Sequence, residues 1–432
     1  MIDLTQLRRE PVAVTAALVR RGVSAEEVAE VHALDEEHRR RLQEAEGLRA
    51  QVKALSREVA AARRAGDAAA AEALTDRSRT LGDEEHAATA AADDLAQRLR
   101  ARWLQLPNLP DPAVPDGRDE HDNVEVRRWW PGIAEGREQP TYAEHQRVPH
   151  WETGAALGIL DLEAGAKLAG SMFPLFRGRG ARLVRALGAF ALDHHQDAFE
   201  EIRPPTLALT ETMESTGHLP KSADDMYAIE RDGLWAIPTA EVPLTSMHRG
   251  EILDEERLPV RMTALTACFR REAGAAGRDT RGLLRVHEFD KVELFAYCTP
   301  EQAPAVHADV LERAETLLRE LGLTYRVLDL CAGDLGASSA RTFDLEVYSP
   351  GVDRWLEVSS VSWFRDYQSR RANVRYRRAD GSTALVHTVN GSALAWARIW
   401  AALVEVGRQP DGSVRLPDVL APYLGTTHLT RG

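Results

Sequence analysis

The clearest pattern in the sequence is a heptad spacing of apolar positions near its N-terminus. One series alternates steps of four and three and consists of Leu48, Val52, Leu55, Val59 and Ala62. A second series repeats every seven residues through Leu74, Leu81, Ala88 and Leu95, and reaches Arg102. Such heptads predict helices paired along an apolar seam, and Gly66-Asp67 supplies a turn between them. We therefore expect an antiparallel coiled-coil hairpin over about residues 26–104, within an N-terminal domain of residues 1–106.

The stretch from Arg39 to Arg64, on the first leg of this hairpin, holds eight basic and three acidic residues, although residues 26–100 are acidic overall. The candidates for contact with a phosphate backbone are Arg39, Arg49, Lys53, Arg57, Arg63 and Arg64. A basic helix face suits nucleic-acid binding. Taken alone, the charge run is more typical of a solvated helix face, and the hairpin of a dimerisation arm or a spacer.

The pattern changes at the prolines that follow the hairpin. Pro107, Pro110 and Pro112 end the second helix and predict a linker over residues 107–140. Beyond it, helical stretches alternate with β-rich runs; the helices are expected at 182–199 and 304–321, and the strands at 291–297, 324–330, 343–348 and 355–359. This alternation predicts an α+β domain over residues 141–432, built on a largely antiparallel β-sheet flanked by helices.

Composition narrows the class of protein. The chain has 432 residues, of which 44% are hydrophobic and 28% charged, as in a globular protein. Its sequence contains no apolar run long enough for a signal peptide or a membrane span, so we expect a cytoplasmic protein with no membrane partner. The net charge of −13 argues against a uniformly basic surface but permits a local basic one. The three cysteines lack the spacing of a structural zinc site and are expected to be buried free thiols.

The segment with the strongest chemical signal begins at Thr266-Ala267-Cys268-Phe269-Arg270-Arg271-Glu272-Ala273-Gly274 and ends in Arg285-Val286-His287-Glu288-Phe289-Asp290-Lys291-Val292-Glu293. This pattern is typical of a strand, a basic loop and a returning strand. Arginines at a strand end can hold phosphate oxygens in pairs. Phe289 can stack on a base, and Glu293 shares its face of the strand. Any one of these residues alone would equally suit a surface hairpin with salt bridges. No Gly-x-Gly-x-x-Gly follows a strand and no Gly-x-x-x-x-Gly-Lys occurs, so the Rossmann and P-loop phosphate sites are absent from the sequence.

The order of residues in this segment resembles motif 2 of class II aminoacyl-tRNA synthetases, and specifically of the bacterial-type seryl-tRNA synthetases. Other blocks agree with that family in the same order along the chain: Thr216–Pro220, Pro238–Pro243, Gly333–Gly336, Glu357–Ser360, Gln368–Arg371 and His387–Ser392, followed by Arg398. The resemblance extends over essentially the whole chain, including the hairpin.

The resemblance implies a class II serine–tRNA ligase that activates L-serine with ATP and transfers it to the 3′ end of tRNA(Ser). The catalytic residues it implies are Arg270, Arg398 and Glu357. The ATP-binding residues it implies are Arg270, Glu272, Phe289, Glu357, Val358, Ser359, Ser360 and Arg398. Glu357 and Ser360 are implied to bind Mg²⁺. The serine-binding residues it implies are Thr239, Ala240, Glu241, Arg270, Glu293 and Ser392.

The family also implies partners for the rest of the chain. The hairpin is expected to grip tRNA(Ser) through the basic residues of its first leg, and the loop Gly274–Gly282 to meet the acceptor end. A homodimer is expected, in which the arm of one subunit delivers tRNA to the site of the other.

The sequence departs from the family at Val361, Trp363, Trp396 and Trp400, which are larger than usual. Compensated packing is one interpretation. The alternative is a specialised paralogue that resists an antibiotic or serves natural-product biosynthesis, with the Trp363 indole beside the ATP and serine site. A catalytically retired tRNA-binding regulatory paralogue is a further alternative, disfavoured by the intact motif residues.

Overall fold

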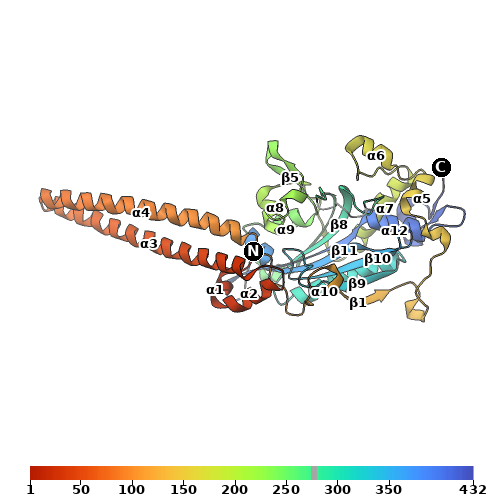
Figure 1. The fold of residues 1–432 in the computed structure, drawn as a ribbon, viewed down its shortest axis with the longest axis horizontal. Coiled ribbons are helices and arrows are strands. Elements are labelled where there is room, and N and C mark those ends of the chain that lie inside the picture. The colour runs from red at the N-terminus through yellow and green to blue at the C-terminus, as the bar shows by residue number, and fades with distance from the viewer. Residues whose placement is uncertain (274–279, 432) are drawn as a thin grey trace. The chain divides into compact units, whose positions relative to one another are not determined.

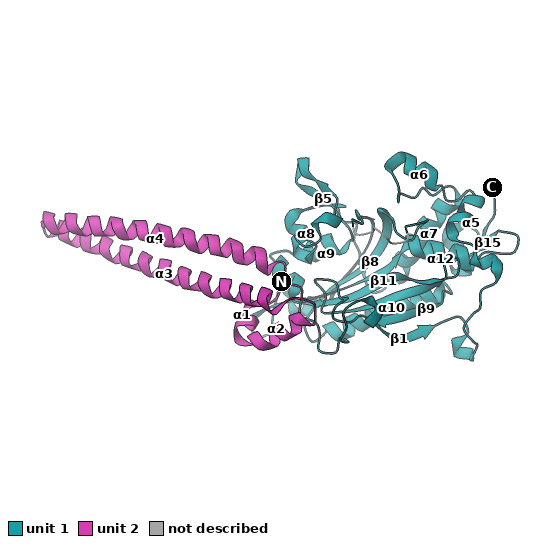
Figure 2. Ribbon diagram, in the orientation of Figure 1, with its two compact units in different colours: residues 1, 108–432 teal, residues 2–107 magenta. Residues whose placement is uncertain are grey.

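A computed structural model describes residues 1–273 and 280–431. The chain forms two compact units (Figure 2): the helical unit, residues 2–107, and the sheet unit, which comprises Met1 and residues 108–432. The loop expected to meet the acceptor end, Gly274–Gly282, falls largely outside the described residues. Among the described residues, no helix combines the length and the hydropathy that a membrane crossing requires.

The helical unit consists of four helices: α1 (Leu4–Arg9), α2 (Pro11–Val19), α3 (Ala25–Arg64) and α4 (Ala68–Trp103). The Ser24 side chain caps the start of α3, and the Glu27 side chain bonds back to the Ser24 backbone. The left-handed conformation of Gly66, with φ of +78°, turns the chain, and Asp67 caps α4. The predicted coiled-coil hairpin is thus confirmed (Figure 1).

Small residues dominate the seam between α3 and α4. Its buried residues beyond the base of the hairpin are Ala45, Leu55, Ala71, Ala88 and Ala92, whereas Val28, Val31, Asp35, Leu95 and Leu99 lie toward the base. The seam also carries an ion pair between the legs, with Arg49 Nη2 2.7 Å from Glu85 Oε1. Arg102, the last member of the heptad series, lies outside the seam and pairs with Glu30 at 3.0 Å. The seam therefore buries little apolar surface for its length.

The sheet unit is built on a sheet whose described strands follow the order β1-β9-β10-β11-β14-β8-β7-β2 (Figure 1). All neighbouring pairs are antiparallel except β2 and β7. The strands are β1 (Val124–Trp129), β2 (Glu200–Glu201), β7 (Val260–Phe269), β8 (Glu288–Cys298), β9 (Tyr325–Asp329), β10 (Arg341–Ser349), β11 (Arg354–Arg365) and β14 (His387–Ala395). This arrangement confirms the predicted α+β class and the largely antiparallel sheet.

Helices cover the sheet and smaller sheets flank it. The helices are α5 (His150–Ala156), α6 (Leu162–Ala169), α7 (Arg179–His195), α8 (Thr210–Thr216), α9 (Glu241–Ser246), α10 (Ala303–Glu320), α11 (Tyr367–Ala372), α12 (Trp396–Val406) and α13 (Ala421–Leu424). The short strands are β3 (Leu207–Leu209), β4 (Ala228–Ile229), β5 (Leu234–Ala236), β6 (Ile252–Asp254), β12 (Arg375–Arg377), β13 (Thr383–Leu385), β15 (Val414–Arg415) and β16 (His428–Leu429). α10 lies on the face of the sheet that carries Gly391 and Val361, since a Cβ on Gly391 would lie 2.5 Å from Val310 of that helix.

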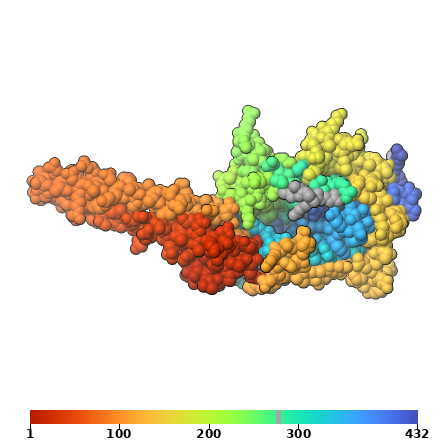
Figure 3. Space-filling view, in the orientation of Figure 1, coloured from red at the N-terminus to blue at the C-terminus, as the bar shows by residue number. Residues whose placement is uncertain are grey.

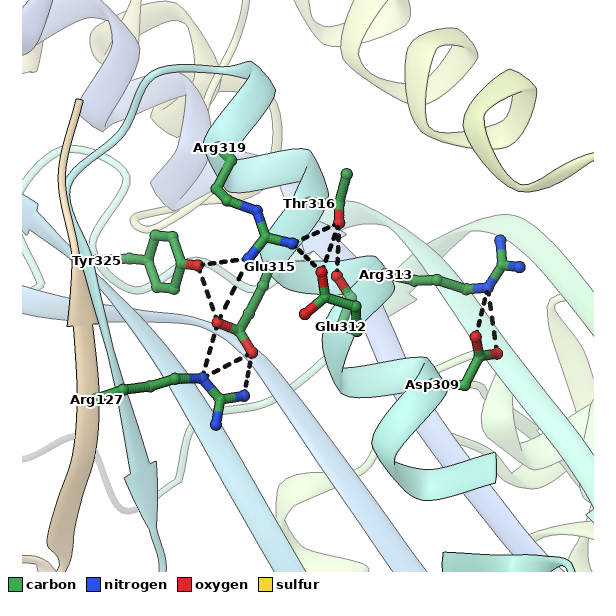
Figure 4. A network of polar contacts seen from close by, with 8 residues as sticks. All are labelled: Arg127, Asp309, Glu312, Arg313, Glu315, Thr316, Arg319 and Tyr325. Carbon is green, nitrogen blue, oxygen red and sulfur yellow. Dashed lines mark hydrogen bonds and ion pairs between the residues drawn. The ribbon is translucent and has the colours of Figure 1, made fainter. Parts of the chain in front are cut away.

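A polar network ties the edge strand β1 to α10 (Figure 4). Arg127 Nε lies 3.0 Å from the buried Glu315 carboxylate, which also accepts a hydrogen bond of 2.9 Å from the Tyr325 hydroxyl. Residues 124–129 lie within the segment that the prolines assigned to a linker. They form a strand of the main sheet because β9 supplies backbone partners and Glu315 a buried partner for Arg127, neither of which is local in sequence.

Candidate active site

A cavity of about 490 Å³ opens in the sheet unit, on the face of the sheet opposite α10. The space-filling view shows this unit hollowed between its green and blue segments (Figure 3). The strands β8, β11 and β14 and the start of α12 provide part of its wall, and loops that include residues 217–222, 283–286 and 336–339 provide much of the rest. Segments distant in sequence thus meet around one hollow.

Two β-bulges decide which side chains face the cavity. In β11, Ser359 pairs with Leu345 and Glu357 pairs with Glu346, so Val358 is an extra residue. The bulge places Glu357 and Ser360 on one face, although three positions apart they would otherwise point to opposite faces. In β14, Ser392 pairs with Glu293 and Ala395 with Lys291, and the bulged residue Leu394 has φ of +81°. Ser392 and Ala395 consequently both line the cavity.

One end of the cavity is a buried network of charged and polar groups, which we call the acidic end: Thr239, Glu241, Lys291, Glu293 and Gln368. Lys291 forms an ion pair with Glu293, and its Nζ lies 2.9 Å from Thr239 Oγ1. Thr239 in turn donates to Glu293 Oε2 at 3.0 Å. Within the described residues, Glu293 Oε1 is buried without a hydrogen-bond partner. A buried acceptor in that state is suited to a ligand that donates a hydrogen bond.

Glu241 belongs to the same acidic end, and its carboxyl group has a raised pKa. Gln368 Nε2 donates to Glu241 Oε1 at 2.6 Å, and Thr388 Oγ1 donates to Gln368 Oε1 at 2.7 Å. Burial, and secondarily the charge of Glu293, raise the pKa of Glu241 to about 7. Glu241 therefore changes its charge near neutral pH in the ligand-free protein.

The other end carries arginines, and we call it the arginine end: Arg270, Glu272, Arg285, Phe289 and Arg398. The Arg270 guanidinium lies 5.2 Å from the centre of the Phe289 ring, and among the described residues it has no hydrogen bond or ion pair. Glu272 pairs with Arg285. Arg398 donates from Nε to the Leu284 carbonyl at 3.1 Å and from Nη1 to the Glu357 carbonyl at 2.7 Å. Two guanidinium groups from distant motifs thus reach one cavity.

Oxygen donors gather beside Arg398, whose Nη1 lies 3.7 Å from Glu357 Oε2. Glu357 and Ser360 both line the cavity, and Ser360 interacts with Asp344 on the neighbouring strand. Burial, and then the charge of Glu357, raise the pKa of Asp344 well above its usual value. Within the described residues, Asp344 Oδ1 is buried and has no hydrogen-bond partner. Mg²⁺ uses few protein oxygens when phosphates supply the others, so this donor set suits that ion.

Most residues predicted for the site line this single cavity: Thr239, Glu241, Arg270, Glu272, Phe289, Glu293, Glu357, Val358, Ser360, Ser392 and Arg398. Ala240 and Ser359 do not line it. Ala240 packs into a hydrophobic cluster, and Ser359 Oγ donates to the Ser392 carbonyl at 2.7 Å.

Trp363 also lies outside the cavity wall. Ser362 and Phe364 of β11 line the cavity, and Trp363 between them packs with the core and donates from Nε1 to His387 Nδ1 at 3.2 Å. The expectation that its indole sits beside the site is wrong because alternation along the strand turns it to the other face.

The predicted tRNA-contacting residues all lie on α3, and two of them have local partners. Arg49 pairs with Glu85, and Arg39 Nε lies 3.7 Å from Asp35 Oδ2. The others, Lys53, Arg57, Arg63 and Arg64, are exposed toward the tip of the hairpin.

Three residues of the site went unassigned in the sequence. Lys291 lies between Phe289 and Glu293 with the period of two that places all three on one face, so its position was readable from the strand pattern. His218 also lines the cavity, and its Nδ1 lies 2.7 Å from Thr216 Oγ1. Gln368 stands behind Glu241, and no local pattern indicates that contact.

The two units match known domains separately. Residues 1–110 match the seryl-tRNA synthetase N-terminal domain, and residues 227–407 match the tRNA synthetase class II core domain (G, H, P, S and T). A serine–tRNA ligase from Gemmatimonas aurantiaca is 47% identical over 431 residues, which is 98% of this chain and 99% of the relative. The corresponding ligase of Methylobacterium nodulans is 46% identical over 98% of both chains.

Solved structures agree with these matches. The seryl-tRNA synthetase of Pyrococcus horikoshii complexed with ATP superposes with a TM-score of 0.91 at 34% identity, over the full length of both chains. A cytoplasmic serine–tRNA ligase of Naegleria fowleri in complex with AMP has a TM-score of 0.85 at 25% identity, covering 100% of this chain and 99% of that chain. From sequence and fold together, this chain belongs to the seryl-tRNA synthetase family.

Proposed function

We propose that this chain is a serine–tRNA ligase, which forms seryl-adenylate from L-serine and ATP and then transfers serine to tRNA(Ser). The observation that carries the proposal is the sharing of one cavity by Arg270, Arg398 and the unpartnered carboxylate oxygen of Glu293. The arginine end provides charge for a triphosphate, and the acidic end a small site for a ligand with hydrogen-bond donors.

Serine occupies the acidic end in this proposal. Its ammonium group faces Glu241, and its hydroxyl donates to Glu293 Oε1. Thr239 and Ser392 complete the pocket, and Lys291 holds Glu293 in place. A site that pairs a buried hydroxyl rejects alanine, since alanine would leave the Glu293 oxygen unpaired. Ala240 and Ser359 take part only through the backbone they position.

ATP occupies the arginine end. Phe289 stacks on the adenine, Glu272 contacts its edge, and Arg398 binds the outer phosphates. A carboxylate oxygen of serine attacks the α-phosphorus, the bond to the β-phosphate oxygen breaks, and pyrophosphate leaves. Arg270 neutralises the charge that develops during this in-line displacement, so positioning and electrostatics supply most of the acceleration.

Glu357 and Ser360 are the residues we assign to Mg²⁺, with Val358 shaping the bulge that brings them together. When bound, the ion would neutralise phosphate charge and orient the triphosphate. The buried, unpartnered oxygen of Asp344 behind Ser360 fits a site that is completed by a cation.

The hairpin is the tRNA-binding arm in this proposal. Lys53, Arg57, Arg63 and Arg64 provide exposed positive charge for the tRNA backbone, and Arg39 and Arg49 contribute once they exchange their local carboxylate partners. The homodimer remains a prediction drawn from the family resemblance, and the cytoplasmic location remains one drawn from the lack of a long apolar run in the sequence.

Serine-dependent exchange of pyrophosphate into ATP tests the first half of the reaction. We expect exchange with serine and none above background with alanine or glycine; its absence at saturating serine would overturn the proposal. Charging of tRNA(Ser) transcripts tests the second half. A retired paralogue would bind tRNA without exchange. A specialised paralogue would retain exchange and differ in its sensitivity to seryl-adenylate analogues.

A further inference from the structure

A buried histidine–glutamate pair lies behind the arginine end and has no part in the reaction described above. His150, the first residue of α5, and Glu405, near the end of α12, are both completely inaccessible to solvent. His150 Nδ1 lies 2.7 Å from Glu405 Oε1. Burying two ionisable groups is costly, so such a pair needs partners for its remaining polar atoms.

Every contact of the Glu405 carboxylate involves a donor. The backbone N–H groups of His150 and Gly351 donate to it at 3.0 Å each, and the Ser349 hydroxyl donates to Oε2. A carboxylate surrounded by donors acts only as an acceptor. The His150 Nδ1 atom must therefore be the donor in the contact with Glu405.

The second ring nitrogen of His150 then has a fixed role. His150 Nε2 lies 2.9 Å from the backbone nitrogen of Leu283, whose N–H can only donate. Nε2 must consequently accept this hydrogen bond, which matches a ring that carries its proton on Nδ1. Glu405 thus sets the tautomer that lets His150 hold the Leu283 N–H.

Leu283 and Leu284 connect this pair to the cavity. Both residues line it, and the Leu284 carbonyl accepts the 3.1 Å hydrogen bond from Arg398 Nε. The short backbone segment is therefore held at one end by His150 and at the other by Arg398. Glu405 and Arg398 also share α12, so the helix and this segment are linked twice.

Close packing leaves this arrangement little freedom. A Cβ on Gly282 would lie 2.4 Å from His150 Nε2, and a Cβ on Gly351 would lie 2.6 Å from the Glu405 carboxyl carbon. Larger residues at either position would separate the hydrogen-bonded groups. The two glycines thus permit the approach on which the pair depends.

We propose that His150, oriented by Glu405, is a positioning residue that sets the Leu283–Leu284 backbone and through it the Arg398 guanidinium for ATP. This inference rests on the proposed function, since it takes ATP as the ligand of the arginine end. It predicts that losing the Nε2 acceptor weakens the use of ATP and leaves the use of serine unchanged.

The test compares His150→Leu and His150→Gln in the full-length chain, by serine-dependent pyrophosphate exchange. We expect His150→Leu to raise the KM for ATP by about tenfold, because the buried Leu283 N–H loses its acceptor. The serine KM should stay within about twofold of the original. The Gln side chain offers an amide oxygen in place of Nε2 and should restore most of the ATP KM.

Two further variants separate positioning from general damage. His195→Leu removes another fully buried histidine, whose ring nitrogens have no hydrogen-bond partner in the described residues, and should leave the ATP KM unchanged. Gly282→Ala keeps His150 but displaces it from Leu283, and should raise the ATP KM as His150→Leu does. If His150→Leu fails to fold, Gly282→Ala still tests the idea.

A double-mutant cycle tests whether His150 affects ATP binding through Arg398. If His150 acts through Arg398, His150→Leu should change the ATP KM little in an Arg398→Ala background. Equal effects in both backgrounds would overturn the proposal, as would equal rises in the ATP and serine KM values. A wild-type chain without exchange would instead overturn the proposed function.

Discussion

The two units of this chain place their functional residues in opposite environments. In the sheet unit the acidic end is buried, and Glu293 is completely inaccessible to solvent. In the helical unit the candidate tRNA contacts lie exposed, and the buried residues of the seam beyond the base of the hairpin are mainly alanine. Single substitutions in the first should therefore have large effects, because buried polar groups lose their partners. In the second, effects should be small, additive and dependent on salt.

The largest effect is expected from removing the Arg270 guanidinium. Arg270→Ala should lower serine-dependent exchange by at least about 10³-fold, because the charge that develops at the α-phosphate loses its main counter-charge. Arg270→Lys retains the charge but lacks the planar pair of donors and should recover only part of the rate. Thermal unfolding close to that of the original chain would establish that both variants fold. Near-normal exchange by the alanine variant would contradict the assigned role.

Shortening the hairpin tests the independence of the two units. Removing three heptads, 21 residues, from each leg keeps the seam in register, so residues 44–64 and 68–88 are deleted and the native turn Ala65-Gly66-Asp67 joins residue 43 to residue 89. We expect exchange within about twofold of the original and a fall in tRNA(Ser) charging of about 100-fold or more, since most phosphate contacts are lost. Equal loss of both activities would show that the arm also supports the chemistry.

A pH dependence of intermediate size follows from Glu241. Burial and the Glu293 charge raise the pKa of Glu241 to about 7, so below that pH the ligand-free site has no Glu241 charge for the serine ammonium. The serine KM should fall as the pH rises through 7, by at most about tenfold per unit. The folded chain retains a proton that an unfolded Glu releases near pH 4.5, so the contribution of Glu241 to stability decreases from pH 4.5 to 7. Glu241→Gln should flatten the KM profile; an unchanged profile would assign the titration to another group.

These cases show which parts of the site the sequence could predict. The helical hairpin could be predicted from the heptads and from Gly66, because the local spacing of apolar residues determines which helix face is paired. The shared face of Phe289 and Glu293 followed from the period of two, and the same period could have identified Lys291 between them. The shared face of Glu357 and Ser360 could not be predicted from the strand pattern. Strict alternation places them on opposite faces, and only the bulge at Val358 brings them to the same face. The family resemblance identified that pair where strand geometry alone would have separated it.

Contacts between distant segments were also unreadable from local patterns. Gln368 reaches Glu241 and His150 reaches Leu283 across more than a hundred positions of the chain. The strand β1 lies among prolines that indicate a linker, and it is fixed by the buried Glu315 of α10. In each case the partner that decides the conformation lies outside any window of sequence.

Smaller effects are expected from the exposed charges of the arm. Lys53→Gln and Arg57→Gln should each weaken tRNA(Ser) binding about two- to fivefold and together lower the slope of log K against log salt by about 1 to 2. Arg98→Gln, at an exposed α4 residue near the base of the hairpin, is a matched control that should leave the slope unchanged. A salt slope unaffected by the double substitution would exclude this face of α3 from the contact.

The smallest expected effects are changes in stability when one glycine in each unit is replaced by alanine. Gly82 lies within α4, and a Cβ there would have no heavy atom within 4 Å, so Gly82→Ala should stabilise the helical unit by about 1 kcal/mol. Gly391 lies in β14, where a Cβ would come within 2.5 Å of Val310, so Gly391→Ala should destabilise the sheet unit through overpacking. Amide hydrogen exchange of the full chain measures both, because it reports the protection of each unit separately. Slower exchange in α4 for Gly82→Ala would show that its seam has unused room, whereas no change would mean that the glycine is already compensated in the folded hairpin.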